Sequence, residues 1–180
     1  MFVIHGSSRP NGNTEAFTHM MINGINTEQV YLRDYTVHPI TDQRHDADGF
    51  QPVNDDYQHL IEKMLEHDTI IFATPLYWYG MSGYMKNFVD RWSQSLRDTS
   101  LHFKEEMKDK KMYVVIVGGD NPKLKALPLI AQFQYIFDFV GSSFEGYIIG
   151  DANAPREISK DKEALAKVKL YNEHFKNNDQ

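Results

Sequence analysis

Short runs of aliphatic and β-branched residues alternate along this chain with longer segments that are apolar on one face only. Four of the runs are almost continuously apolar, which is typical of strands covered on both faces of a sheet. A weaker run follows the first helical segment. The sequence therefore predicts five strands, at residues 2–5, 29–32, 69–74, 112–117 and 144–149.

Between these runs, apolar residues recur at the spacing of one helical face. This pattern predicts helices over residues 57–65, 85–92 and 129–140, in addition to a first helix after residue 12. Pro128 is placed to start the third of these, and Gly141 to stop it. A last helix is expected to begin after Ser159 as its N-cap and to turn four residues inward, namely Leu165, Val168, Tyr171 and Phe175.

Strands that alternate with helices indicate βαβ units and a parallel sheet. Five strands and five helices match an α/β, flavodoxin-like, doubly wound sheet of order 2-1-3-4-5 with helices on both faces, built as one domain over residues 1–180. Ligands of such sheets lie beyond the carboxyl ends of the strands, so function is expected in the loops after strands one, three and four. The long polar segment 33–54 is expected to be functional or mobile.

Composition narrows the possible functions. The formal charge of −6 disfavours nonspecific binding to nucleic acid or anionic lipid. The absence of cysteine excludes disulfides, thiolate nucleophiles and cysteine-held iron–sulfur clusters. No segment approaches the roughly 20 apolar residues that span a bilayer, and the N-terminal apolar stretch is too short for a signal peptide. We expect a soluble, cytoplasmic protein.

The loop after the first strand, residues 6–14, has the composition of a phosphate site. Unpaired N–H groups at a helix N-terminus attract phosphate, and two glycines in the loop allow close backbone approach. The loop lacks the lysine ending of a P-loop and the glycine pattern of dinucleotide folds. A polar turn with an N-cap is the alternative interpretation. The candidate phosphate ligands are Ser7, Ser8, Arg9, Asn11, Asn13 and Thr14.

The loops after strands three and four could enclose a flat ring. Three consecutive aromatic residues cannot all be buried by strand or helix periodicity, and they can border a π surface. Two glycines after strand four would let backbone amides approach such a ring. The alternatives are an aromatic loop that closes the core or contacts another subunit, and an ordinary glycine turn. The candidate residues are Pro75, Leu76, Tyr77, Trp78, Tyr79, Gly80, Gly118, Gly119 and Asp120.

Segments 6–14 and 75–91 together resemble the two signatures of the NAD(P)H-dependent FMN reductase and quinone reductase family, in the same order and spacing. The resemblance implies bound FMN and either NADH or NADPH as co-substrate. It also implies contacts of residues 76–80 with the flavin. The family habit and a surplus of aromatic and apolar residues around 76–84 and Trp92 lead us to expect a homodimer or homotetramer. We expect the nicotinamide cofactor to dock on the exposed flavin face, bordered by Tyr77, Trp78 and Tyr79 and by segment 33–54. Electrons would pass to a small acceptor such as a quinone, flavin, nitro or azo compound. No side chain need act as a catalytic acid or base.

Other functions remain open or are disfavoured. A flavodoxin-type electron carrier without reductase activity and a non-catalytic flavin or nucleotide sensor are the alternatives to an enzyme. A calcium loop at Asp46 fails because position 57 is tyrosine, and Glu15 with His19 has no third ligand nearby, so no metal site is predicted. The hydrolase pattern G-x-S-x-G is absent from the sequence.

Overall fold

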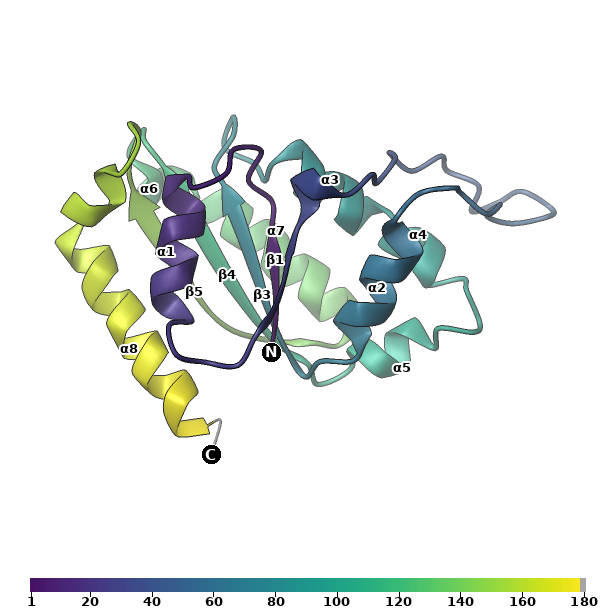
Figure 1. The fold of residues 1–180 in the computed structure, drawn as a ribbon. Coiled ribbons are helices and arrows are strands. Elements are labelled where there is room, and N and C mark those ends of the chain that lie inside the picture. Colours follow the sequence, from purple (N-terminus) through teal and green to yellow (C-terminus); the bar gives the residue numbers. More distant parts are fainter. Residues whose placement is uncertain (179–180) are drawn as a thin grey trace.

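The computed structural model describes residues 1–178 and contains one parallel sheet of order β2-β1-β3-β4-β5, as predicted. Every neighbouring pair of strands is parallel, so all carboxyl ends lie at one edge of the sheet, at the top of Figure 1. The strands are β1 (Phe2–His5), β2 (Glu28–Tyr31), β3 (Thr69–Pro75), β4 (Lys111–Gly118) and β5 (Ser143–Asp151).

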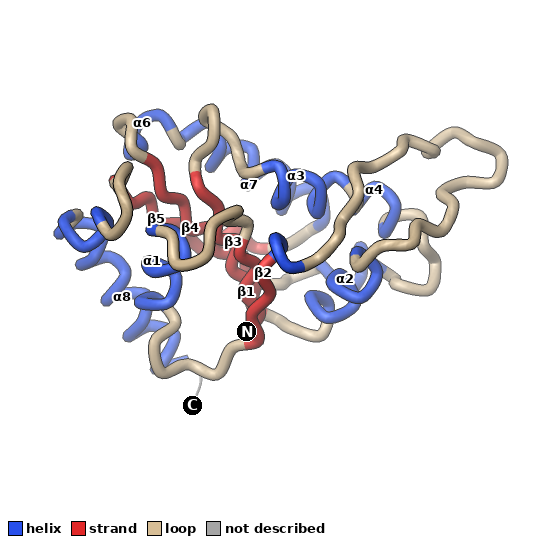
Figure 2. The backbone as a smooth tube through the Cα atoms, turned by 45° about the horizontal axis from the view of Figure 1, so that its top comes forward, coloured by secondary structure: helices blue, strands red, loops and turns tan. Residues whose placement is uncertain are grey.

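Helices cover both faces of the sheet (Figures 1 and 2). One face carries α1 (Asn13–Met21) and α8 (Lys162–Asn178). The other carries α2 (Tyr57–Leu65), α3 (Gly83–Asp90), α4 (Trp92–Ser95), α5 (Phe103–Met107) and α7 (Leu127–Val140). The shorter α6 (Pro122–Lys125) and two 3₁₀ turns, Leu32–Asp34 and Glu157–Lys160, complete the described elements.

The core is two apolar layers, one on each face of the sheet. Alternate residues of a strand point to opposite faces, so Val114 joins the layer under α7 while Val115 joins the layer under α1 and α8. Both are fully buried. Burial of an aliphatic side chain of this size contributes about 1.5–3 kcal/mol, and it requires apolar residues on both sides of the strand. This double burial explains why the runs of the three inner strands, β1, β3 and β4, are continuously apolar, whereas the edge strands β2 and β5 are only partly buried.

The structure corrects the start of the last helix. Ser159 lies inside a 3₁₀ turn, and α8 begins at Lys162. Asp161 takes the capping role, because its carboxylate accepts a hydrogen bond of 3.0 Å from the backbone N–H of Ala164. Val168 and Phe175 are buried as predicted. Gly141 ends α7 with a φ of +80°, which also confirms the prediction.

The expected count of five helices is too low. Helix α4 is separate from α3, whereas the sequence pattern predicted one helix over 85–92. Helices α4, α5 and α6 have four, five and four residues, too few to show the repeat of an amphipathic face.

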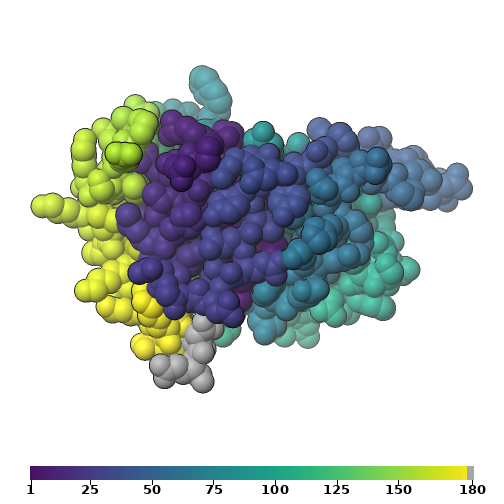
Figure 3. Space-filling view, in the orientation of Figure 1, coloured from purple at the N-terminus to yellow at the C-terminus, as the bar shows by residue number. Residues whose placement is uncertain are grey.

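A long arm, residues 35–56, contains no helix or strand and projects from the body beyond α4 (Figures 1 and 3). Its base is held by a buried ion pair, in which the side chains of Asp55 and Arg91 are 1% and 3% exposed. Within residues 1–178, no helix is long and apolar enough to cross a membrane.

Candidate functional site

The loop after β1 turns sharply and packs tightly against α3. The backbone N–H of Gly6 donates a hydrogen bond of 2.8 Å to the carbonyl of Ala73 in β3. A Cβ atom at Gly6 would lie 2.9 Å from the Ser82 hydroxyl oxygen, so only glycine fits. Asn11 has a φ of 54°, a left-handed conformation that asparagine tolerates better than most residues. The loop therefore reaches α1 by a backbone path that glycine and asparagine permit.

The N-terminus of α1 is open toward a cavity. Gly12 is the N-cap, and no side chain caps this helix. The first-turn residues Asn13 and Thr14 line a cavity of about 250 Å³ together with Ser7 and Arg9. Backbone N–H groups and the positive end of the helix therefore face a space that an anion can enter.

The predicted phosphate ligands differ in how free their side chains are. Ser7 and Asn13 are buried and hold the loop: the Ser7 hydroxyl donates to the Arg9 carbonyl at 3.1 Å, and the Asn13 amide donates to the Ala154 carbonyl at 2.8 Å. Ser8 and Arg9 are exposed at the rim. Ser7 and Asn13 therefore mainly hold the geometry of the loop, whereas the Arg9 side chain is free at its rim.

The loop after β3 forms a tight two-residue turn. The N–H groups of Tyr77 and Gly80 each donate to the other's carbonyl at 3.0 Å. The two residues between them reverse the chain, and the turn projects at the top of Figure 3. Tyr77 and Tyr79 are each 46% exposed and Trp78 is 96% exposed, so none of the three rings closes the core.

The loop after β4 fits closely under that turn. The N–H of Leu76 donates to the Val117 carbonyl at 2.8 Å, which extends β3–β4 pairing by one residue. A Cβ atom at Gly118 would lie 2.9 Å from the Leu76 Cβ, and one at Gly119 would lie 2.5 Å from the Asn153 Cβ. The structure thus gives a local packing reason for both glycines, besides the expected approach of their amides to a ligand.

Two neighbouring cavities join the three loops into one site. The cavity at the N-terminus of α1 adjoins a second cavity of about 260 Å³, lined by the aromatic turn and Asp120. Leu76, Gly119 and Asn153 line both cavities. We call the two adjoining cavities the groove: they lie at the carboxyl edge of the sheet, with the N-terminus of α1 at one end and the aromatic turn at the other.

Comparisons with known proteins agree with this arrangement. Residues 1–134 match the family described as NADPH-dependent FMN reductase. YwqN of Bacillus subtilis (strain 168), which has the provisional name NAD(P)H-dependent FMN-containing oxidoreductase, is 50% identical over 165 residues, 91% of each chain. The chain belongs to the NADPH-dependent FMN reductase family. The predicted family, cofactor class and oxidoreductase activity are thereby confirmed.

Solved structures support the same family fold. The Trp repressor binding protein from Bacillus subtilis is 45% identical, with a TM-score of 0.80 over 94% of this chain and 98% of that one. An FMN-dependent NADH-azoreductase from Bacillus anthracis, solved with FMN, has a TM-score of 0.69 at 11% identity, over 99% of this chain and 98% of that one. This second likeness concerns the fold alone.

The family match ends within α7, yet the loop after β5 also reaches the site. Ala152 and Asn153 line the groove, and sequence reasoning missed them. The Glu157 carboxylate fixes this loop by accepting hydrogen bonds from the N–H groups of Ala154 and Asn153, at 2.7 and 3.1 Å, which lower the Glu157 pKa. The general rule that ligands lie beyond the carboxyl ends of strands could have found these residues.

The arm lies away from this groove. We considered residues 33–54 as a border of the nicotinamide pocket, but the arm projects past α4, on the opposite side from α1 and α8 (Figure 2). Its hydrogen bonds to the body include two from Arg91, which donates to Asp55 at 2.7 Å and to the His38 carbonyl at 3.3 Å, and one from the Asn87 amide to the Val37 carbonyl at 3.4 Å. Within one chain, the arm therefore does not border the cavities.

Glu15 and His19, which we considered as metal ligands, have other partners. Glu15 forms an ion pair of 2.9 Å with Arg33, and the His19 ring lies 3.0 Å from the Tyr31 hydroxyl. In the described part of the chain, no group of three or more histidine, aspartate or glutamate side chains could hold a metal ion.

Proposed function

We propose that the groove binds FMN and that the protein passes electrons from NADH or NADPH through this FMN to a small acceptor. The observation that carries the proposal is that the two cavities adjoin, with Leu76, Gly119 and Asn153 lining both. An open helix N-terminus at one end and an aromatic-lined hollow at the other support the binding of a flavin mononucleotide.

The residues at each end fit the parts of FMN. The uncapped N-terminus of α1, the Thr14 side chain and the exposed Arg9 guanidinium supply donors and positive charge for one phosphate group. The hollow beside Trp78 and Tyr79 offers aromatic surface, and Gly119 brings backbone to its floor. The donor set at one end and the rings at the other thus suit a mononucleotide with one flat ring system.

The protein's own contribution is binding and orientation. When bound, FMN would supply the chemistry of hydride and electron transfer between NAD(P)H and the acceptor. The backbone near Gly118 and Gly119 is rigidly placed by the close contacts of Leu76 and Asn153, so its amides can stabilise negative charge without rearranging. The aromatic turn leaves one side of the hollow open for substrates, and no acid or base is needed there.

NAD(P)H and the acceptor are expected to take turns at this open side. The sequence has one phosphate loop and no second nucleotide fingerprint, so the nicotinamide cofactor has no domain of its own. Initial rates of NADPH oxidation at several menadione concentrations test this proposal. Parallel double-reciprocal lines support one shared site, whereas intersecting lines contradict it. Absence of NADH and NADPH oxidation in the FMN-loaded protein would favour an electron carrier instead.

Trp78 provides a sharper test of the open side. Its ring is 96% exposed, so Trp78→Ala removes a substrate-facing surface and little core packing. We expect kcat/KM for NAD(P)H to fall more than FMN affinity does. Leu124→Ala, which removes a 62% exposed side chain from α6, is the control. A change in FMN affinity alone would place Trp78 on the flavin instead of on the substrate side.

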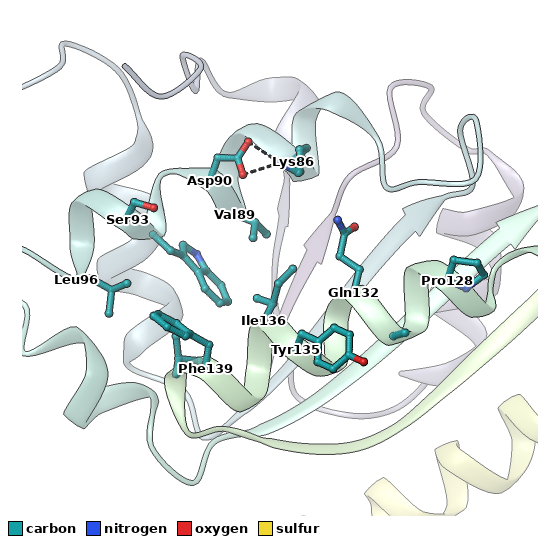
Figure 4. A pocket seen from close by; sticks show the side chains of 13 residues that line it. Lys86, Val89, Asp90, Ser93, Leu96, Pro128, Gln132, Tyr135, Ile136 and Phe139 are labelled. Carbon is teal, nitrogen blue, oxygen red and sulfur yellow. Dashed lines mark hydrogen bonds and ion pairs between the residues drawn. The ribbon is translucent and has the colours of Figure 1, made fainter. Parts of the chain in front are cut away.

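We also propose that the protein is a homodimer formed through the exposed face of α7. Tyr135 and Phe139 are 74% and 66% exposed, and both line a cavity of about 650 Å³ against α3 and α4 (Figure 4). Protruding rings and a hollow on the same face are self-complementary, which a two-fold interface requires. The Lys86–Asp90 ion pair, 2.7 Å, lies at its edge. The sequence predicts the apolar surplus around Leu76–Tyr84 and Trp92. Trp92 is buried in the core, whereas Tyr77, Trp78, Tyr79 and Tyr84 are exposed.

A further inference from the structure

The aromatic turn Tyr77–Gly80 has a backbone that its own residues disfavour. Trp78 has a φ of 48° and Tyr79 a φ of 63°. Two-residue hairpin turns with positive φ at both central positions normally carry asparagine, aspartate or glycine. Large side chains in this conformation are strained, and such strain persists only where the surroundings impose it. Something outside the turn must therefore hold it.

Contacts to two different loops supply that restraint. On one side, the hydroxyl groups of Tyr77 and Ser8 lie 3.2 Å apart, which ties the turn to the loop after β1. On the other side, the Tyr79 hydroxyl donates a hydrogen bond of 2.8 Å to the Asp120 carboxylate, in the loop after β4. Trp78 at the tip is almost fully exposed, so the flanking tyrosines are the restrained members of the turn.

Lys125 fixes the carboxylate that receives Tyr79. Its amino group donates to the same Asp120 oxygen at 2.5 Å and lies 5.5 Å from the centre of the Tyr79 ring. Hydrogen bonds from Lys125 and Tyr79 lower the pKa of Asp120, which keeps the carboxylate charged. Both charged side chains are at least 40% exposed, so the ion pair alone contributes little stability. Its effect is to orient the acceptor of the tyrosine.

We propose that Asp120 is a positioning residue, which acts through Tyr79 to hold the strained aromatic turn over the flavin end of the groove. This inference rests on the proposed FMN site and assigns Asp120 a different role from direct cofactor contact. Its Oδ2 atom accepts from both Tyr79 and Lys125, and the residue lines the hollow beside Trp78. A restrained turn presents its rings in one geometry, which lowers the entropy lost on ligand binding.

A double-mutant cycle distinguishes the two roles. FMN dissociation constants are measured by flavin fluorescence for the wild type, Tyr79→Phe, Asp120→Ala and the double variant. Loss of one hydrogen bond should raise each single variant's dissociation constant about 5-fold. If Asp120 acts through Tyr79, the double variant is no weaker than the single variants. If Asp120 contacts FMN directly, the fold-changes multiply, and the proposal is wrong.

Two further variants serve as controls. Asp120→Asn keeps an oxygen that can accept from Tyr79, so it should retain most of the affinity that Asp120→Ala loses. Tyr84→Phe removes a hydroxyl group from a 41% exposed tyrosine of α3 and should bind FMN as the wild type does. Equal losses in Asp120→Asn and Asp120→Ala would also contradict a role through Tyr79.

A second readout uses the flavin-free protein. The chain has two tryptophans, exposed Trp78 and buried Trp92. Acrylamide quenches the fluorescence of the exposed tryptophan selectively, which identifies the part of the signal that comes from Trp78. Time-resolved anisotropy should show faster local motion of Trp78 in Tyr79→Phe and in Asp120→Ala, with no change in Tyr84→Phe. Unchanged anisotropy in both Tyr79→Phe and Asp120→Ala would overturn the proposal. Failure of the wild type to bind FMN would refute the proposed function, and this measurement would still decide the role of Asp120.

Discussion

The side-chain amide of Asn13 donates a hydrogen bond of 2.8 Å to the carbonyl of Ala154, across 141 positions of sequence. The bond joins the first turn of α1 to the loop after β5. The Oδ1 atom of Asn13 also accepts a longer hydrogen bond, of 3.5 Å, from the N–H of Ile158. One asparagine thus ties together two loops that line the same groove.

Asn13→Ala should therefore destabilise the protein even without FMN. The side chain is buried, and its removal leaves the Ala154 carbonyl without this donor, at a cost of about 1–2 kcal/mol in the free energy of unfolding. Urea denaturation of the flavin-free protein measures the loss. Asn54→Ala, in the exposed arm, is the matched control. If only FMN affinity changes, Asn13 is a phosphate ligand and not a tether.

Arg9→Ala should weaken FMN binding by about 1.5–3 kcal/mol, the range of a charge-assisted hydrogen bond. Arg9 lines the cavity at the α1 N-terminus and is exposed at its rim. Isothermal titration with FMN checks this prediction. Arg97→Ala, which removes an exposed guanidinium from the region after α4, should leave the affinity unchanged. Equal affinity of Arg9→Ala and wild type would remove Arg9 from the site.

Asp55→Ala should destabilise the fold strongly. The side chains of Asp55 and Arg91 are both buried, and removing Asp55 leaves the buried guanidinium without its carboxylate partner, a kind of loss that costs about 3–5 kcal/mol. The matched control is Asp42→Ala, whose partner Arg44 is also 2.7 Å away but whose side chain is 52% exposed. Surface pairs contribute about 0–1 kcal/mol, so the control should change little. Thermal unfolding of both variants measures the two losses of stability, and equal losses in Asp55→Ala and Asp42→Ala would contradict the prediction.

Stability should decrease as the pH falls from about 6.5 to about 4, in part because of His5. Burial lowers the pKa of His5 from 6.5 to about 4, and in the described chain its Nδ1 atom has no hydrogen-bond partner. The unfolded chain then binds a proton at a higher pH than the folded chain does. The resulting loss is about 3 kcal/mol at most, and it is absent above pH 6.5.

The variant His5→Gln isolates this contribution. The free energy of unfolding is measured against pH for His5→Gln and for the wild type. The wild type should lose more stability between pH 6.5 and 4 than the variant does. His45→Gln, in the exposed arm, controls for the removal of one imidazole. Parallel curves for His5→Gln and wild type would mean that His5 is not the group responsible.

Phe139→Glu should shift the protein from dimer to monomer. The ring is 66% exposed on α7, and a charge there opposes burial against a second copy. Light scattering at micromolar concentration measures the mass. Leu170→Glu replaces a side chain of equal exposure on α8 and should remain dimeric. A monomeric wild type would contradict the dimer itself.

The sequence determined the fold class and indicated the loops that line the candidate groove. Buried strands must be apolar on both faces, and long helices must carry one apolar stripe, so the sheet order and the placement of the long helices follow from pattern and connection rules. The loops after β1, β3 and β4 could be identified because glycine, aromatic residues and short polar residues cluster there without periodicity. Local composition is enough to predict a residue's role wherever that role depends on its neighbours in the chain.

Only the tertiary structure decided how individual side chains are used. The bond from Asn13 to Ala154, the pairing of Asp55 with Arg91 and the hydrogen bond from Tyr79 to Asp120 join residues 36 to 141 positions apart. No local pattern encodes such pairs, because they depend on where separate loops meet. The same reason explains why Asn153 was missed and why the arm was expected beside the groove. Sequence placed the loops at one edge of the sheet, and packing decided which atoms there are free to bind.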